Sequence, residues 1–204
     1  IVPEGSYSRT DQLVAYLNEH TTVPVLYTKE ALQKEKEGHQ LFYKYDTHWN
    51  NLGGFVGGQV LNEYFHGEYV SLDEVVCKAK KTNVSGDLAR MLSMGNIYND
   101  DTEWQVKGYK KDVRLEKSMD GNDFVFSSNA KDDRSLLVYT DSFGYALMEM
   151  AKDYANVRFS RNTDNFKYFC DTMQPDVVVL EMVERWKEGQ ETWCSGLYDL
   201  LDKP

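Results

Sequence analysis

The last third of the sequence alternates short apolar runs with segments of helical periodicity, and this alternation restricts the fold most strongly. Apolar runs at 136–140, 156–160 and 176–183 predict strands, and helices are predicted over 143–155 and 165–174 between them. This order predicts a parallel sheet with right-handed crossovers. The third run is almost continuously apolar, which predicts a strand covered on both faces. Sites in such sheets form at the carboxyl ends of the strands.

The first two thirds are consistent with an α/β chain. A short buried strand is predicted over 23–27. The stretch 66–130 is polar and less periodic, and its short strands predict a small antiparallel insertion. Helices are predicted over 10–20, 28–38 and 51–65, and a short one over 85–95. We therefore expect a single domain over residues 1–204.

The predicted helix 51–65 contains four glycines, at positions 53, 54, 57 and 58. A glycine in a helix interior destabilises the helix by about 1 kcal/mol relative to alanine. Four of them predict that another element packs very close to this helix, and a tight crossing over the sheet would be sufficient.

Charge and cysteine content exclude several classes of function. The net charge is −10, whereas proteins that bind nucleic acids or anionic membranes need a basic surface. The cysteines, Cys77, Cys170 and Cys194, form no CxxC pair or His/Cys cluster, so neither a zinc site nor any other metal is expected. Three cysteines allow at most one disulfide.

No apolar stretch approaches the roughly 20 residues of a membrane helix. The sequence starts at Ile1, within what reads as an extended segment, so we expect a natural N-terminal segment to precede it. The lack of a signal peptide in the sequence therefore carries little weight.

Ser142 lies where the predicted strand 136–140 turns into a helix. A buried strand that breaks at a serine is a common way to present a nucleophile. The simpler interpretation of this position is a helix N-cap, because Ser and Asp are both good caps. The nucleophile hypothesis needs a base elsewhere in the chain.

His48 is the best candidate for that base among the four histidines. It follows Asp46 by two residues, and in an extended segment this spacing places both side chains on the same side of the chain. The carboxylate can then orient the imidazole while the other ring nitrogen faces the nucleophile. A metal half-site is the alternative, but one Asp–His pair supplies too few ligands. Asp46, His48 and Ser142 are thus a candidate triad.

The motifs DTHWN, NLGG, SGDLARML, YTDSFG and PDVVVLEMVERW occur in this order over nearly the whole chain, after the lead-in IVPEGSYS. Together they resemble the SGNH-like domain of the alginate O-acetyltransferase family (AlgJ and AlgX) and its Gram-positive DHHW-motif relatives. The resemblance implies an SGNH-hydrolase-like, flavodoxin-like three-layer sandwich with a mostly parallel sheet. The Asp–His pair precedes the serine, so the motif order is circularly permuted relative to ordinary SGNH hydrolases.

The resemblance also implies a function. Asp46 and His48 match the D-x-H-W motif and Ser142 matches the serine of G-D-S-F. Family members are extracytoplasmic and transfer or remove acetyl groups on polysaccharide hydroxyls, without a cofactor. They work beside a membrane-bound O-acyltransferase that supplies the acetyl group. The alternative from another class is a catalytically vestigial module that binds a glycan or a biosynthetic partner.

The sequence departs from the family pattern at two positions. Thr140 replaces the glycine before Asp141, which makes the turn less permissive, and Thr47 stands where the DHHW relatives have His. Further site residues are expected around the serine. Asn162 is the candidate second oxyanion donor beside the Ser142 N–H. Arg185 either binds a uronate or phosphate or pairs with a neighbouring glutamate. Three aromatic residues complete the set: Trp49, as a sugar platform or as packing behind His48, and Tyr145 and Trp186 in an acceptor groove.

Overall fold

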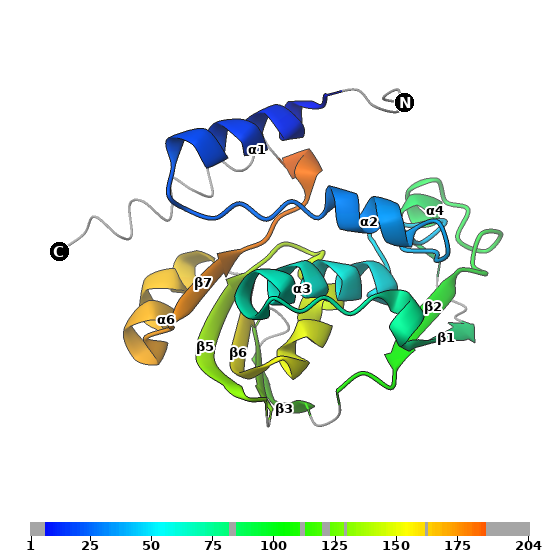
Figure 1. Cartoon of the computed structure of the whole chain (residues 1–204). Coiled ribbons are helices and arrows are strands. Elements are labelled where there is room, and N and C mark those ends of the chain that lie inside the picture. Colours follow the sequence, from blue (N-terminus) through cyan, green and yellow to red (C-terminus); the bar gives the residue numbers. More distant parts are fainter. Residues whose placement is uncertain are drawn as a thin grey trace.

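A mixed five-stranded sheet forms the centre of the protein (Figure 1). The computed structural model describes residues 7–81, 85–110, 113–119, 123–128, 130–161 and 163–186. The strands have the spatial order β3-β4-β6-β5-β7: β3 (Val113–Met119), β4 (Asp123–Ser128), β6 (Tyr154–Ser160), β5 (Asp132–Tyr139) and β7 (Val177–Leu180). β5 pairs in parallel with β6 and with β7, whereas β4 is antiparallel to both of its neighbours. Only β4 therefore runs against the other strands, and the predicted mainly parallel sheet is confirmed.

Helices and a separate strand pair surround this sheet. The α-helices are α1 (Arg9–His20), α2 (Lys29–Glu35), α3 (Asn51–His66), α4 (Asp87–Met91), α5 (Gly144–Leu147) and α6 (Phe166–Met173). Single 3-10 turns are η1 (Leu72–Glu74), η2 (Met148–Lys152), η3 (Thr163–Asn165) and η4 (Glu184–Trp186). β1 (Val76–Lys81) and β2 (Thr102–Lys107) form the antiparallel pair. Among the described helices, none combines the length and apolar character needed to cross a bilayer.

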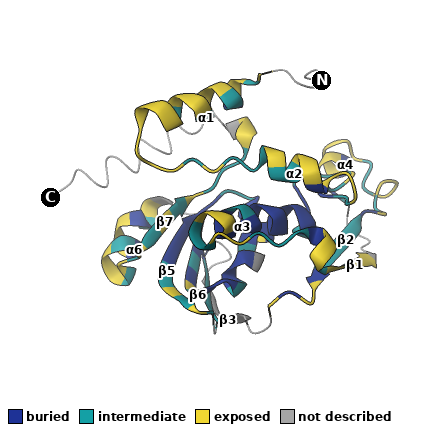
Figure 2. Cartoon of the chain, viewed as in Figure 1, coloured by how far each residue is buried: buried dark blue, intermediate teal, exposed yellow. Residues whose placement is uncertain are grey.

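The middle of the sheet, around β5, is buried between helices on its two faces (Figure 2). Alternate residues of β5 point to opposite faces, as the two-residue period of a strand requires. Leu136 and Val138 pack with α3, α5 and η2, and Leu137 and Tyr139 pack with α6. All four of these side chains are fully buried, so β5 is the central strand of the core. Ser142 follows its carboxyl end.

The glycine face of α3 confirms the predicted close packing but changes its partner. Asn50 caps the helix, because its side-chain oxygen accepts from the first backbone N–H groups. A Cβ placed at position 54 would overlap the backbone of Ala146 in α5, and one at position 57 would lie 2.9 Å from the ring of Trp49. The glycines thus allow Trp49 and α5, rather than the sheet, to pack closely against α3.

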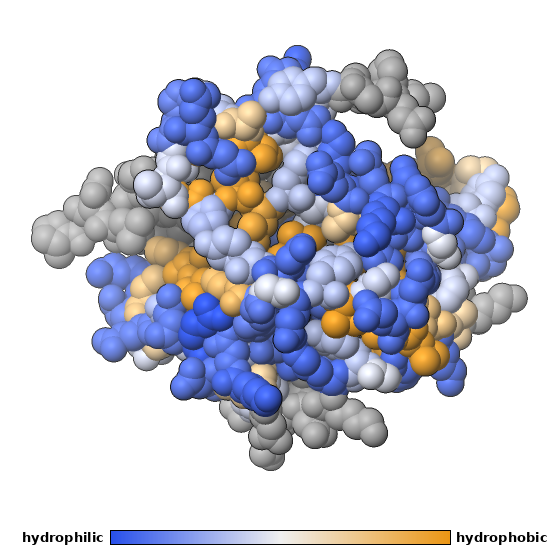
Figure 3. Space-filling model, in the orientation of Figure 1, coloured by the Kyte–Doolittle hydropathy of each residue, from blue (hydrophilic) through white to orange (hydrophobic). Residues whose placement is uncertain are grey.

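Two apolar runs predicted as strands differ from the structure. The run 23–27 forms no strand, because none of the described strands pairs with it, and Val23 and Leu26 are exposed. β7 lies at the edge of the sheet and exposes Val178 and Leu180, so it is covered on one face only. In Figure 3, apolar surface is visible below α1 and towards β7.

The predicted helix 143–155 is shorter and irregular. It consists of α5 followed by the 3-10 turn η2, and Tyr154 already belongs to β6, where it pairs with Asp132. The predicted antiparallel insertion is also divided. β3 and β4 extend the central sheet, and only β1 and β2 form a separate pair. Cys77 and Cys170 are free thiols, whereas Cys194 lies outside the described residues.

Candidate active site

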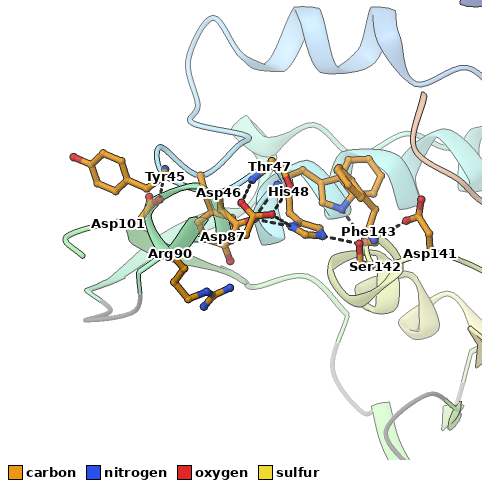
Figure 4. Close-up of polar contacts among 12 residues, drawn as sticks. Tyr45, Asp46, Thr47, His48, Asp87, Arg90, Asp101, Asp141, Ser142 and Phe143 are labelled. Atoms are coloured by element: carbon orange, nitrogen blue, oxygen red, sulfur yellow. Dashed lines mark hydrogen bonds and ion pairs between the residues drawn. The ribbon is translucent and has the colours of Figure 1, made fainter. Parts of the chain in front are cut away.

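Asp46, His48 and Ser142 form a continuous hydrogen-bonded chain (Figure 4). The distance from Asp46 Oδ1 to His48 Nδ1 is 2.6 Å, and that from His48 Nε2 to Ser142 Oγ is also 2.6 Å. With Nδ1 protonated, the imidazole donates to the carboxylate and accepts the serine proton at Nε2. The predicted convergence of these three side chains is therefore observed.

Asp141 shapes the turn that carries Ser142. Its Oδ1 accepts from the backbone N–H of Phe143 at 2.7 Å, and its Oδ2 accepts from that of Val183 at 2.8 Å. Asp141 thereby ties the end of β5 to the segment after β7. α5 begins at Gly144 without a side-chain cap, while the Ser142 hydroxyl bonds to His48. The N-cap interpretation of Ser142 is therefore wrong.

Thr140 occupies the position of the motif glycine without distorting the turn. Its side chain is buried, donates to Glu181 Oε2 and packs directly against Gly144. A side chain at position 144 would overlap the Thr140 hydroxyl. The turn thus has its glycine four residues after the threonine, and this glycine makes room for the Thr140 side chain.

The imidazole of His48 is held by aromatic packing. The centre of its ring lies 4.7 Å from the centre of the Phe143 ring. Trp49 is buried, and its indole N–H donates to the Phe143 carbonyl at 2.8 Å. Of the two predicted roles for Trp49, the geometry favours packing that fixes the histidine, because a buried indole cannot serve as a sugar platform.

Asp87, at the start of α4, is a site residue that the sequence reasoning did not identify. Its backbone N–H donates to Asp46 Oδ2 at 2.8 Å, and its Oδ2 lies 3.7 Å from His48 Nδ1. Its two carboxylate oxygens accept from the N–H and the hydroxyl of Thr47 at 2.8 and 2.5 Å. Asp87 lies in the motif SGDLARML, which carried the resemblance without a role for any single residue.

Electrostatics keep Asp46 ionised. Partial burial acts to raise the pKa of Asp46, but hydrogen bonds from the Asp87 N–H and from His48 outweigh it and lower the pKa below its ordinary value. The opposite holds for Glu181. Burial and the nearby charge of Asp141 raise the pKa of Glu181 to about 7.

The structure places only some of the other predicted site residues. Arg185 donates to the hydroxyl of Thr47 at 3.2 Å and lies 5.2 Å from the ring centre of Phe143, so it adjoins the triad instead of pairing with a glutamate within the described residues. Tyr145 is partly exposed and accepts from Arg161 at 3.1 Å. The Trp186 backbone ends η4, but its side chain lies outside the described residues, as does Asn162. Their roles stay predictions.

Asp46, His48 and Asp87 also present three possible metal-ligand atoms within 4.8 Å of one another. Their donor atoms are already used in hydrogen bonds: Asp46 with His48, and both Asp87 oxygens with Thr47. A cation would have to replace these bonds. The arrangement therefore fits an oriented imidazole better than a metal centre.

No family model and no curated protein sequence matches the chain. Solved structures do match. A DHHW family protein from Eubacterium siraeum aligns with a TM-score of 0.66 and 14% identity, covering 89% of this chain and 73% of that one. PatB1 from Bacillus cereus gives 0.59 and 13%, with coverages of 91% and 77%. The O-acetyltransferase domain of Pseudomonas putida AlgJ gives 0.53 and 20%, with 87% and 64%.

The chain shares the fold of these proteins. The likeness confirms the SGNH-like fold that the motif order predicted. At identities of 13% to 20%, the structural likeness establishes a common architecture alone. The chemistry must therefore be argued from the site of this chain.

Proposed function

We propose that the chain is an O-acetyltransferase or acetylesterase that acts on hydroxyls of an extracytoplasmic polysaccharide through an acetyl-Ser142 intermediate. The observation that carries the proposal is the Asp46–His48–Ser142 chain, with both bonds at 2.6 Å, after the carboxyl end of β5. The shared fold with an O-acetyltransferase domain supports this class of reaction.

The geometry supports the following order of events. His48 Nε2 accepts the Ser142 proton as Oγ attacks the acetyl carbonyl, and the same nitrogen then protonates the departing alcohol. An acceptor hydroxyl, or water, next gives its proton to His48 and attacks the acetyl-serine, and the serine oxygen recovers a proton from His48. Asp46 holds the imidazole in the required tautomer and stabilises the imidazolium. The reaction needs no cofactor.

The acceptor and the partner belong to the same proposal. Arg185 and Tyr145 lie close to the nucleophile turn, and with Trp186 they are the candidate acceptor-binding residues. A membrane-bound O-acyltransferase is the proposed acetyl donor, and the proposed location is the cell surface or periplasm. The alternative, a vestigial glycan- or partner-binding module, predicts that Ser142 is unreactive.

Covalent labelling separates these two functions. A fluorophosphonate should modify the wild-type protein at Ser142, and Ser142→Ala should abolish labelling and the hydrolysis of 4-nitrophenyl acetate. PatB1, which shares the fold, has been solved with a sulfonyl adduct, so a sulfonyl fluoride is a second probe. Ser93→Ala, at an exposed serine, is the matched control and should label normally. An unlabelled wild-type protein would favour the binding module.

A further inference from the structure

The loop that carries the Asp–His dyad is held from outside by two aspartates of the middle region. Asp101 Oδ2 accepts from the backbone N–H groups of Lys44 and Tyr45 at 2.8 and 3.1 Å. The Tyr45 carbonyl in turn accepts from the first turn of α4, through Leu88 N–H at 3.1 Å. These bonds fix the chain just before Asp46.

Asp87 holds the next two residues of the loop. Its backbone N–H donates to the Asp46 carboxylate, and its own carboxylate accepts both the N–H and the hydroxyl of Thr47. Gly86 permits this approach, because a Cβ at that position would overlap the Tyr45 carbonyl. Asp87 thus contacts both members of the motif that precede His48.

Thr47 extends the connection to Arg185. The Thr47 hydroxyl and the His48 ring approach the same Asp87 oxygen: Oδ2 lies 2.5 Å from Thr47 Oγ1 and 3.7 Å from His48 Nδ1. The Thr47 hydroxyl donates its single proton to Asp87 Oδ2, and its oxygen accepts from Arg185 Nη2 at 3.2 Å. The bond to Asp87 therefore directs the oxygen lone pairs of Thr47 towards the arginine.

We propose that Asp87 is a positioning residue of this site, which orients the Asp46–His48 dyad directly and Arg185 through the Thr47 hydroxyl. The inference rests on the proposed function and names a device that serves it. Asp87 contacts neither the nucleophile nor a reacting atom in this arrangement. Its effect comes from the geometry that it imposes on Asp46 and Thr47.

Conservative substitutions test the proposal with 4-nitrophenyl acetate as substrate. Asp87→Asn keeps the backbone N–H and one carbonyl oxygen but cannot accept both Thr47 bonds. Thr47→Val removes the hydroxyl at similar shape, and Thr47→Ser restores it. We expect Asp87→Asn and Thr47→Val to lower kcat by about 10- to 100-fold, the range of a misplaced catalytic group, with KM within about threefold. Thr47→Ser should stay within about threefold of wild type.

The double variant tests whether Asp87 and Thr47 act through the same interaction. If Asp87 and Thr47 act through one hydrogen bond, Asp87→Asn with Thr47→Val should be no slower than about the slower single variant. A double loss equal to the product of the single losses overturns the proposal. So does a kcat within threefold of wild type for either single variant. Asp133→Asn, at an exposed aspartate of β5, is the control and should leave kcat unchanged. Should Asp87→Asn fail to fold, the Thr47→Val and Thr47→Ser pair decides alone.

A spectroscopic measurement separates failure of this proposal from failure of the proposed function. The His48 Nδ1 proton, hydrogen-bonded to Asp46, should give a downfield NMR resonance in the wild-type protein whether or not the protein hydrolyses esters. We expect Asp87→Asn and Thr47→Val to shift or broaden it, and Thr47→Ser and Asp133→Asn to preserve it. An inactive, unlabelled wild-type protein with this pattern would refute the function only. An unchanged resonance in Asp87→Asn and Thr47→Val would refute the positioning role.

Discussion

Among single residues, Glu181 shows most clearly how a side chain's position makes protein stability depend on pH. It follows β7, accepts the Thr140 hydroxyl, and lies close enough to Asp141 for that carboxylate to disfavour its ionisation. Burial is the larger cause of its raised pKa. The folded protein therefore retains a proton on Glu181 that the unfolded chain releases at lower pH.

Glu181→Gln should stabilise the protein progressively as pH rises. Between the ordinary pKa of 4.5 and the folded value of about 7, the unfolded state loses the proton first, so wild-type stability falls with increasing pH. The loss of wild-type stability that Glu181 causes is fully present above pH 7 and corresponds to at most roughly 3 kcal/mol. Glutamine is neutral in both states and can still accept from Thr140. Urea unfolding at pH 5 and pH 8 measures the difference, and an equal gain at both pH values would contradict the explanation.

Asp46 should remain ionised at neutral pH, because its pKa is lowered. The kcat/KM for 4-nitrophenyl acetate should then fall as the pH is lowered, since only a neutral imidazole accepts the serine proton. Asp46→Asn should lower kcat/KM by about 10²- to 10⁴-fold, because the amide favours the wrong tautomer. A flat pH profile for the wild-type protein would exclude a histidine base.

At the scale of elements, α3 determines how closely the nucleophile turn approaches the core. The helix contacts α5 through Gly54 and the ring of Trp49 through Gly57, while Trp49 bonds the carbonyl of Phe143. The small residues of one helix therefore set the position of the turn that contains Ser142. A helix of the same length with alanines at these positions could not occupy the same place.

Gly54→Ala should destabilise the protein and slow the reaction together. The added methyl group would overlap the backbone of Ala146, which cannot move without shifting α5. Overpacking of this kind costs about 1–3 kcal/mol. The matched change Gly38→Ala adds a methyl group where nothing lies within 4 Å, so it should be neutral or slightly stabilising. Thermal unfolding and kcat/KM of both variants test this, and unaltered values for Gly54→Ala would show that α5 can yield.

The long periodic segments could be predicted from sequence because their apolar stripes report burial directly. The helix 51–65 and the strands 136–140 and 156–160 are observed within a few residues of the predicted bounds. The strand predicted over 23–27 was wrong because a short apolar segment does not show whether a neighbouring strand pairs with it. The edge position of β7 was missed for the same reason: strand order is a property of the whole sheet.

For the whole molecule, the polar middle region acquires a role that its composition does not show. Asp46, His48 and Ser142 could be predicted because the chemistry demands those residue types in recognisable settings. Asp87 and Asp101 could not, because their function consists of contacts with a loop far away in sequence. The region expected to be an insertion thus supplies the aspartates that hold the dyad in place.

The balance between acetyl transfer and hydrolysis depends on how the surface around the serine binds an acceptor. The protein is acidic, with a net charge of −10, yet the described residues place Arg185 beside the triad, where it bonds Thr47 and rests on Phe143. A small aryl ester needs only the triad and oxyanion donors, whereas a glycan must also be held in line with the acetyl-serine.

Arg185→Ala should therefore reduce acetyl transfer to a polysaccharide acceptor at least about fivefold more than it reduces hydrolysis of 4-nitrophenyl acetate. Any common loss in both assays reports the contact with Thr47, and the excess loss in transfer reports acceptor binding. Lys167→Ala, an exposed cation on α6, is the control and should leave the ratio unchanged. Equal losses in the two assays would mean that Arg185 acts only through the dyad loop. The acceptor would then be bound by another part of this surface or by a partner.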